Sequence, residues 1–459
     1  MKKADRRLLE KLVEISGSDN VIADGPAYED YSHDMADYMA EPAVVVRPRS
    51  EEEVRRVVEL ARSMSIPILA RGAGSSLTGA AVLEGALVID TRNMNRVLKV
   101  DTVNWLVEVQ AGVSLEDLNK ELKPHGFFFP PDPASSYICT VGGAIAEGSG
   151  GLRCVKYGTM KDWVVALRLV LANGRVARLG EPLAKNRAGY DLVHLVVGSE
   201  GTLGVVTEAY LKIIPIPSVK TNRFLLTFGD WESTGEVIGR LRSSKIMPHL
   251  FEFMDGETIH ALNEKTGTAF DESEATLLVD VEAVVTAEAT KIFESCGALT
   301  IKLAKDEEEA ESFYQARTMA YLAVKSTATG VQVEDISLPI DRLGEYLRTV
   351  KRVAKKHGLR IPVNGHAGDG NVHPVILYEV SDPKSREAAG DAFEELCSIA
   401  IGMGGSVSGE HGIGSQKPRQ LGEQLRAHEG EETLRLMKEI KKVFDPEGLM
   451  NPGKYVDAA

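Results

Sequence analysis

Two histidine-containing segments carry residue types that could do chemistry. One runs from residue 364 to 373 with the sequence NGHAGDGNVH, and the other is SGEHGIG at 408–414. The Asp369-Gly370 dipeptide favours a two-residue type I′ hairpin turn, and such a turn would pair His366 with His373. The two imidazoles would then stand opposite each other on one face, with Cβ atoms about 4.5–5.5 Å apart.

These imidazoles would be within reach of one divalent ion. Glu410 and His411 add a carboxylate and another imidazole, with glycine on both sides. Two histidines and one carboxylate with open coordination positions suit Zn²⁺, Mn²⁺ or Fe²⁺. Paired histidines can also simply pack together, but three of the ten histidines in two glycine-flanked motifs favour the metal.

The composition limits the classes of protein that the chain can belong to. Its 459 residues suggest two or three domains, and its 43% hydrophobic and 26% charged residues are typical of globular proteins. The net charge of −14 argues against binding nucleic acid or an anionic membrane. No apolar run approaches the roughly 18 residues of a spanning helix, and the basic start has no apolar region after it. We therefore expect a cytoplasmic protein without a transmembrane segment.

The four cysteines are widely spaced, which is typical of reduced thiols rather than of a disulfide framework. They form no CxxC pair, so any iron–sulfur cluster that takes electrons from this chain would belong to another subunit. The cysteines are Cys139, Cys154, Cys296 and Cys397.

The amino-terminal half alternates strand and helix patterns. A helix is predicted near residues 8–13, and a strand at 43–46 precedes a capping box formed by Ser50 and Glu53. A helix over 54–61 and a strand at 66–70 complete a βαβ unit. No helix follows the next glycine loop. Strands are predicted instead at 86–90, 96–100 and 105–110, followed by a helix over 115–122 and an ordered loop over 127–160.

Beyond Pro217 the pattern repeats strand and helix, with a long helix over about 306–327. It predicts a second α+β domain on an antiparallel sheet, with a pattern compatible with an internal duplication. We expect a helical segment at 1–41, a first domain at 42–217, a second at 218–415 and a segment at 416–459 that packs back on the first domain.

Glycine clusters in the first domain indicate an extended ligand. Residues 71–76, RGAGSS, follow a strand and offer successive backbone N–H groups that can hold a pyrophosphate. This is not a Rossmann fingerprint, because Leu77 replaces the third glycine and no helix follows. Further clusters at 140–143, 148–151 and 198–204 favour a dinucleotide lying across the domain.

With these motifs, segment 42–217 resembles the FAD-binding domain of the vanillyl-alcohol-oxidase/p-cresol-methylhydroxylase superfamily. The matching pieces include RGAGSS at 71–76, PDPASS at 131–136, TVGG at 140–143, KYG at 156–158 and GSEGTLG at 198–204. The rest resembles the branch that contains D-lactate dehydrogenase, the glycolate oxidase D subunit and D-2-hydroxyglutarate dehydrogenase. The resemblance implies an α+β fold, with a two-part FAD-binding domain and a cap domain whose antiparallel sheet is covered by helices.

The resemblance also assigns roles to residues. It makes His366, His373 and Glu410 the metal ligands, His411 the catalytic base, and Arg317 the residue that clamps the substrate carboxylate. FAD is expected to be non-covalent, because no histidine lies in the 71–79 loop. Ser149 stands in a segment where family members commonly have Asn-Ala-Gly-Gly. The residues expected to contact FAD are Arg71, Gly72, Ala73, Gly74, Ser75, Ser76, Gly79, Pro131, Asp132, Ser136, Thr140, Gly142, Gly143, Ser149, Gly150, Tyr157, Glu200, Gly201, Gly204, Val206 and Asn451.

The implied reaction is oxidation of a 2-hydroxy acid to the 2-oxo acid, with hydride transfer to the flavin N5 atom. Hydroxyglutarate-type members carry a Lys shortly before the segment that matches residues 335–339, and this chain has none. D-lactate or glycolate is therefore favoured over D-2-hydroxyglutarate. The electron acceptor is left open among a quinone, a cytochrome, an iron–sulfur subunit and an electron-transferring flavoprotein, and a homo-oligomer is possible.

Three other functions are compatible with parts of the pattern. An alkyl-dihydroxyacetonephosphate synthase would use FAD without net redox change. A metal-dependent hydrolase would use His366, His373 and Glu410 without flavin, and would leave the glycine-rich domain unexplained. A non-catalytic flavoprotein subunit would bind FAD, but no hydroxy acid would bleach it.

Overall fold

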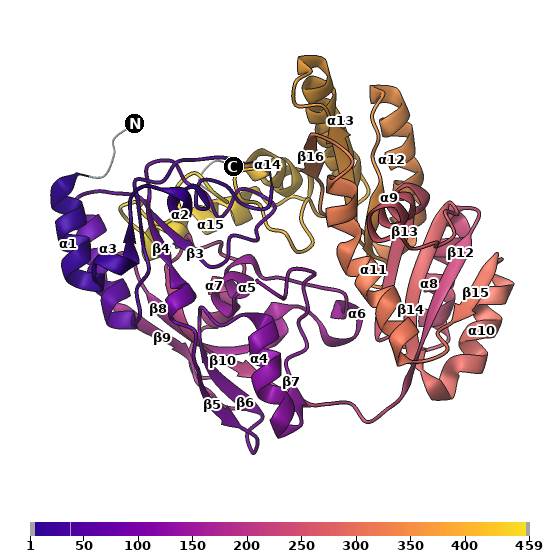
Figure 1. The fold of residues 1–459 in the computed structure, drawn as a ribbon, viewed down its shortest axis with the longest axis horizontal. Coiled ribbons are helices and arrows are strands. Elements are labelled where there is room, and N and C mark those ends of the chain that lie inside the picture. The colour runs from indigo at the N-terminus through magenta and orange to yellow at the C-terminus, as the bar shows by residue number, and fades with distance from the viewer. Residues whose placement is uncertain (1–4, 37, 456–459) are drawn as a thin grey trace. The chain divides into compact units, whose positions relative to one another are not determined.

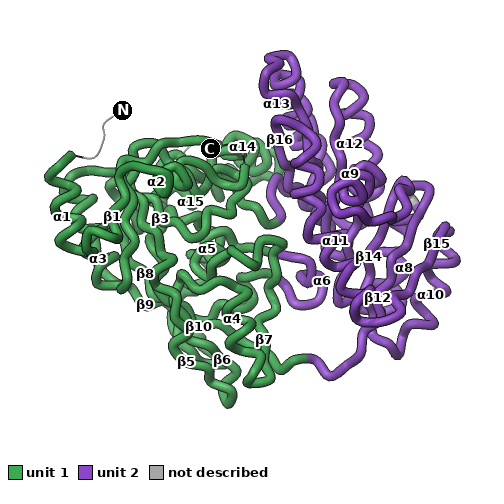
Figure 2. The backbone as a smooth tube through the Cα atoms, viewed as in Figure 1, with its two compact units in different colours: residues 1–150, 159–216, 410–459 green, residues 151–158, 217–409 purple. Residues whose placement is uncertain are grey.

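A computed structural model describes residues 5–36 and 38–455 (Figure 1). They form two compact units (Figure 2). Unit 1 comprises residues 1–150, 159–216 and 410–459, and unit 2 comprises residues 151–158 and 217–409. Both units mix helices with sheets, which confirms the predicted α+β class. The first four residues, which include part of the basic start discussed above, lie outside the described residues.

The first sheet of unit 1 has four strands in the order β1-β2-β4-β3, and β4 runs parallel to both of its neighbours. Helix α3 (Glu51–Ser63) connects β2 to β3. It begins as predicted, because the Ser50 side chain accepts a hydrogen bond from Glu53 N (3.2 Å), and its apolar stripe is buried. The strands are β1 (Val21–Ile22), β2 (Val44–Val46), β3 (Ile68–Arg71) and β4 (Leu87–Asp90).

The second sheet of unit 1 is antiparallel, with five strands in the order β5-β6-β10-β8-β9. Gly174, at φ +79°, supplies the left-handed conformation in the turn between β8 and β9. The strands are β5 (Val97–Asp101), β6 (Leu106–Gln110), β8 (Val164–Val170), β9 (Val176–Gly180) and β10 (Val205–Lys212). Two short strands, β7 (Phe127–Phe128) and β11 (Ile214–Pro215), pair separately.

The prediction of a loop over residues 127–160 is wrong in part, because this segment contains two helices. Helix α5 (Val141–Glu147) begins after Thr140, whose Oγ1 accepts a hydrogen bond from Gly143 N (3.1 Å). Its two glycines lower helix propensity, but the cap and packing against β10 compensate for this. The second helix is the short α6 (Cys154–Tyr157).

Unit 2 is built on one eight-stranded sheet in the order β15-β12-β14-β13-β18-β19-β16, with β17 also paired to β19. Every pairing in it is antiparallel, as predicted. The strands are β12 (Thr221–Phe228), β13 (Leu250–Asp255), β14 (Ala275–Glu282), β15 (Thr300–Leu303), β16 (Gly330–Val333), β17 (Ile336–Ser337), β18 (Val363–His366) and β19 (Asn371–Tyr378).

Helices lie on both faces of this sheet (Figure 1). Helices α9 (Gly256–Thr266) and α11 (Glu307–Lys325) share a buried apolar cluster with Met254 of β13. Helix α8 (Trp231–Ser243) packs on the opposite face, where Trp231 lies edge-on to Phe253. The sheet residues that alternate along β13 therefore contact different helices. The other described helices of this unit are the short α6, α10 (Thr286–Ser295), α12 (Leu343–His357) and α13 (Pro383–Gly402).

The carboxy-terminal residues belong to unit 1. Asn451 Nδ2 donates hydrogen bonds to the carbonyl oxygens of Ala80 (3.0 Å) and Glu200 (2.8 Å), which ties the segment to two glycine-rich loops. Within the described ranges, no helix is both long and apolar enough to cross a bilayer. The other helices of unit 1 are α1 (Arg6–Ser16), α2 (Pro26–Glu29), α4 (Leu115–Leu122), α7 (Val193–Val196), α14 (Pro418–Ala427) and α15 (Glu431–Phe444).

Candidate functional site

The β18–β19 hairpin carries both predicted metal histidines, but its register differs from the prediction. His373 pairs with Asn364, and His366 pairs with Asn371, so the loop has four residues instead of two. The predicted pairing of His366 with His373 is therefore wrong. The N–H groups of Asp369 and Gly370 both turn back to the His366 carbonyl, and this turn sets the longer loop.

The two-residue shift leaves both histidines on the predicted face. Side chains alternate with a period of two along a strand, so a shift of two residues conserves the face. The His366 and His373 rings lie diagonally across the hairpin, with centroids 5.2 Å apart and planes at 85°. Both side chains are buried.

A buried carboxylate that the sequence interpretation did not select orients His366. Glu252 of β13 lies 2.8 Å from His366 Nδ1 and is fully buried. A carboxylate on Nδ1 favours the tautomer whose proton is on that nitrogen, which leaves Nε2 able to bind a metal. The sequence offered one signal, since Glu252 interrupts the otherwise apolar run LFEFM.

Asp335 is the carboxylate that faces His373, at a longer distance than Glu252 faces His366. Its Oδ1 lies 3.6 Å from His373 Nδ1 and accepts a hydrogen bond from Asn371 Nδ2 (2.7 Å). Its Oδ2 accepts hydrogen bonds from Ser408 Oγ (2.7 Å) and Gly409 N (2.9 Å). Asp335 thus connects the hairpin to the segment that leads directly into Glu410.

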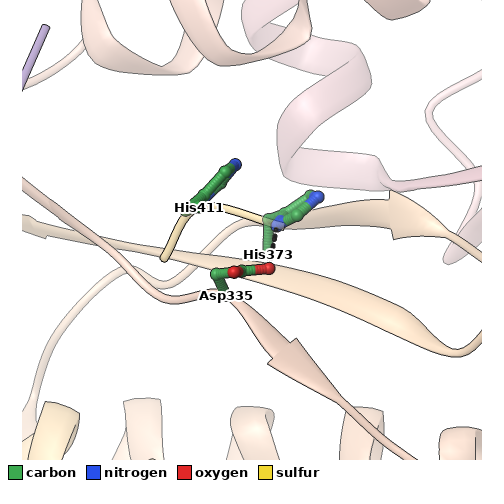
Figure 3. A group of neighbouring side chains, drawn as sticks. All are labelled: Asp335, His373 and His411. Atoms are coloured by element: carbon green, nitrogen blue, oxygen red, sulfur yellow. Dashed lines mark ion pairs between the residues drawn. The ribbon is translucent and has the colours of Figure 1, made fainter. Parts of the chain in front are cut away.

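Two overlapping groups of side chains have metal-binding donor atoms within 4.8 Å of one another. One group is the predicted set of His366, His373 and Glu410. The other consists of Asp335, His373 and His411 (Figure 3). Two imidazoles with one carboxylate fit a divalent transition metal, so the predicted set passes this chemical test. The second group makes His411 an alternative ligand as well as the predicted base.

Arg317 is buried in helix α11, with only 4% of its surface exposed, so it is not a surface arginine. Its Nη2 lies 2.9 Å from Glu252 Oε2, in an ion pair that links it through this carboxylate to His366. Among the described residues, its Nε has no hydrogen-bond partner. A guanidinium with an unused buried donor is suited to bind a carboxylate.

A separate pocket in unit 1 is lined by glycine-rich loops. Seven of the predicted FAD contacts line it: Arg71, Gly72, Gly142, Gly143, Gly201, Gly204 and Val206. Ala70, Thr91, Ala146 and Ser199 also line it and were not selected from the sequence. The lining is mostly glycine and other small residues, so backbone N–H groups can approach a bulky polar ligand closely, as FAD binding requires.

The side chain of one lining residue, Arg71, makes its hydrogen bonds to the surrounding loops. The Arg71 guanidinium donates to the carbonyl oxygens of Asp30, His33 and Ala81, so its charge stabilises the surrounding loops. Tyr157 belongs to unit 2. The residues outside the pocket lining are Ala73, Gly74, Ser75, Ser76, Gly79, Pro131, Asp132, Ser136, Thr140, Ser149, Gly150, Tyr157, Glu200 and Asn451, and their contact with FAD stays a prediction.

Glu200 holds the segment that follows His411. Its carboxylate accepts hydrogen bonds from Ile413 N (2.6 Å) and Gly414 N (2.8 Å). Burial raises the pKa of Glu200 to about 7, and burial together with the nearby Glu200 raises the pKa of Glu147 well above its ordinary value. Thr78 adds a hydrogen bond from its Oγ1 to the His411 carbonyl (3.3 Å). The turn that lines the pocket therefore also positions the predicted base.

Two family models match consecutive parts of the chain. The family model of the FAD binding domain matches residues 42–180, and that of the FAD linked oxidases, C-terminal domain, matches residues 217–455. The chain belongs to the FAD-linked oxidase family, and it is an FAD-linked oxidoreductase.

Curated relatives match over nearly their full length. The glycolate oxidase subunit GlcD of Bacillus subtilis is 35% identical, over 97% of this chain and 96% of that protein. The D-lactate dehydrogenase of Archaeoglobus fulgidus is 36% identical, over 91% of this chain and 92% of that protein. These matches confirm the branch that the motifs indicate.

Solved structures show the same fold at low identity. p-Cresol methylhydroxylase with substrate bound superimposes with a TM-score of 0.81 at 18% identity, covering 99% of this chain and 98% of that one. An alkyldihydroxyacetonephosphate synthase gives a TM-score of 0.77 at 21% identity, covering 98% of this chain and 87% of that one. At this identity the similarity establishes the fold and leaves the reaction open.

Proposed function

We propose that the chain oxidises a small D-2-hydroxy acid, D-lactate or glycolate, to the 2-oxo acid. The observation that carries this proposal is the pair of buried imidazoles, each facing a buried carboxylate, together with a buried arginine, in an FAD-linked oxidoreductase. The names of the relatives, glycolate oxidase subunit and D-lactate dehydrogenase, support the same substrate class.

In the proposed mechanism the side chains have separate tasks. Arg317 binds the substrate carboxylate and orients the hydroxyl-bearing carbon. His411 takes the hydroxyl proton as general base. His366, His373 and Glu410 would hold a divalent ion, which would lower the pKa of a coordinated hydroxyl, and FAD supplies the hydride acceptor.

The residues before Asp335 favour a substrate with one carboxylate. Val331 and Val333 are buried in the apolar cluster under α9 and α11, and Glu334 accepts a hydrogen bond from the Cys397 thiol. None of them supplies the cation that a second carboxylate would need. D-2-hydroxyglutarate is therefore the second candidate, with D-lactate and glycolate ahead of it.

The electrons then pass to a separate acceptor. We propose a partner electron-transfer protein, such as an electron-transferring flavoprotein or an iron–sulfur subunit, because the four cysteines form no cluster motif. Three of them are buried, and none of the four is in a disulfide within the described residues.

The visible spectrum of anaerobic, metal-replete protein tests this proposal. D-lactate, L-lactate, glycolate and D-2-hydroxyglutarate would be titrated separately, and we expect a D-acid or glycolate to bleach the flavin band. His411→Ala should slow bleaching by a factor of about 10²–10⁴, the usual contribution of a general base. A yellow protein that no hydroxy acid bleaches would contradict the proposal and favour a transferase or an electron relay.

A further inference from the structure

Asn364 is a buried amide whose nitrogen has no hydrogen bond. It lies in β18, two residues before His366, and only 3% of its surface is exposed. Its Nδ2 atom has no partner within the part of the chain that the structure describes. Asn371 on the same hairpin is also buried, yet its Nδ2 donates to Asp335 Oδ1 (2.7 Å) and to the Ile336 carbonyl (3.0 Å).

The sheet register places the Asn364 amide beside the metal histidines. Asn364 pairs with His373 on β19 and with Met254 on β13. Residues paired across an antiparallel ladder point to the same face, as do residues two apart on one strand. The amide therefore shares a face with His366, His373 and Met254.

Most of this face next to Asn364 is apolar. Met254, Val333 and Val375 form one buried cluster there with Ala320 of α11, the helix that also carries Arg317. Asn364 thus lies at the boundary between the two imidazoles and an apolar cluster. A leucine, which has a similar shape, would suit the apolar side of that boundary better than an amide.

A buried amide without an acceptor destabilises the folded state, because it loses hydrogen bonds to water and gains none. Buried donors in native proteins are nearly always paired, so an exception points to a group outside the chain. Arg317 Nε is a second such donor, and its guanidinium contacts Glu252, the partner of His366. Two unused donors around the same histidine match the two oxygens of one carboxylate.

We propose that Asn364 determines specificity by donating a hydrogen bond from its amide to a carboxylate oxygen of the substrate. This inference rests on the proposed function, because it adds a contact to the 2-hydroxy acid site. Arg317 supplies the charge, and Asn364 fixes the orientation of the carboxylate plane. A site with a buried donor also rejects analogues that lack the acceptor, since the donor would stay unpaired.

The test compares the holoenzymes of the wild type, Asn364→Leu and Asn364→Asp, with Asn371→Leu as the matched control. Thermal unfolding without substrate, FAD content, metal content, KM and kcat would be measured for each, using whichever of D-lactate and glycolate bleaches the wild type. Asn364→Leu removes an unpaired amide, so its Tm should equal or exceed that of the wild type. Asn371→Leu breaks two hydrogen bonds, so its Tm should fall.

For Asn364→Leu we expect KM to rise about 10-fold or more, as for the loss of a hydrogen bond to a charged group, with FAD and metal content unchanged. Asn364→Asp places a negative charge beside the substrate carboxylate, so its KM should rise further. Each of three results for Asn364→Leu would overturn the inference. An unchanged KM would mean that the amide does not contact the substrate. A loss of bound metal would mean that the amide is a metal ligand, and a fall in Tm would mean that it has a structural partner within the protein.

The proposed function and this inference fail in different ways. If no hydroxy acid bleaches the wild-type flavin, both are overturned. If the wild type is bleached but Asn364→Leu has the same KM, only the role of Asn364 is overturned.

Discussion

Each predicted metal histidine faces its own buried carboxylate, and the two carboxylates work differently. Glu252 lies 2.8 Å from His366 Nδ1 and also forms an ion pair with Arg317. Asp335 lies at 3.6 Å from His373 Nδ1 and accepts three shorter hydrogen bonds from the hairpin and the 408–409 segment. Glu252 thus interacts with two candidate functional side chains, His366 and Arg317. Asp335 interacts mainly with the hairpin and with the 408–409 segment that precedes Glu410.

This difference teaches that similar residue types can give a site two kinds of support. The Glu252 carboxylate balances a buried positive charge, so its removal changes electrostatics as well as ligand orientation. The Asp335 carboxylate satisfies backbone and side-chain donors, so its removal changes loop geometry first. Variants at the two positions should therefore separate metal affinity from local stability.

The largest effect is expected for Glu252→Ala. The substitution leaves the Arg317 guanidinium buried without its ion-pair partner, which typically costs about 3–5 kcal/mol of unfolding free energy. It also frees His366 Nδ1, so the affinity for a divalent metal should fall about 10–100-fold. Urea unfolding and metal titration of the stripped protein measure these two effects.

Glu257→Ala is the matched control for that variant. Glu257 forms an exposed ion pair with Arg360, and such pairs contribute only about 0–1 kcal/mol. Equal losses of stability in the two variants would mean that the burial of the Glu252–Arg317 pair has no energetic consequence. Unchanged metal affinity in Glu252→Ala would remove Glu252 from the metal site.

A smaller effect, on stability more than on metal affinity, is expected for Asp335→Asn. Asparagine keeps one acceptor oxygen but turns an NH₂ group toward donors such as Ser408 Oγ and Gly409 N. An unsatisfied buried donor costs about 1–3 kcal/mol, so the urea midpoint should fall clearly. Metal affinity should fall less in Asp335→Asn than in Glu252→Ala. A larger loss of metal affinity in Asp335→Asn would contradict the proposed difference between the two carboxylates.

Local patterns in the sequence were sufficient to predict most elements that carry these residues. Ser50 and Glu53 marked the start of α3, and short strand-like runs marked the strands of both units. The prediction of a loop over 127–160 was wrong because α5 contains two glycines, which hide the helix. The stability of this helix comes from the Thr140 cap and from packing on β10. Tertiary packing of that kind leaves no periodic signal.

The sequence predicted the histidines of the site, but it did not predict the residues that support them. His366 and His373 stood out because glycines surround them, whereas Glu252 is a single acidic residue in an apolar strand 114 positions from His366. The predicted hairpin register was wrong because the dipeptide Asp369-Gly370 favours a two-residue turn, whereas the N–H groups of these two residues both bond to the His366 carbonyl. The contact between Glu252 and His366 joins distant segments, which one sequence does not reveal. The four-residue turn is local, but the sequence does not distinguish it from a two-residue turn.

A third buried carboxylate, Glu200, extends the comparison to unit 1, and its effect on stability should depend on pH. It accepts hydrogen bonds from Ile413 N and Gly414 N, and burial raises its pKa from an ordinary value of 4.5 to about 7. The folded protein therefore keeps this proton to a higher pH than the unfolded chain does. Raising the pH from about 4.5 to 7 releases the proton more readily from the unfolded chain, so the free energy of unfolding should fall across that interval.

Glu200→Gln removes this titration while keeping one acceptor oxygen, so urea midpoints measured at pH 5, 6, 7 and 8 should fall less steeply than in the wild type. Asp255, whose pKa burial also raises to about 7, still titrates in the variant and leaves part of the slope. Identical slopes would show that Glu200 is ionised in the folded protein throughout. Glu200 would then hold the 412–414 segment as a charged acceptor, as Asp335 is expected to hold Gly409.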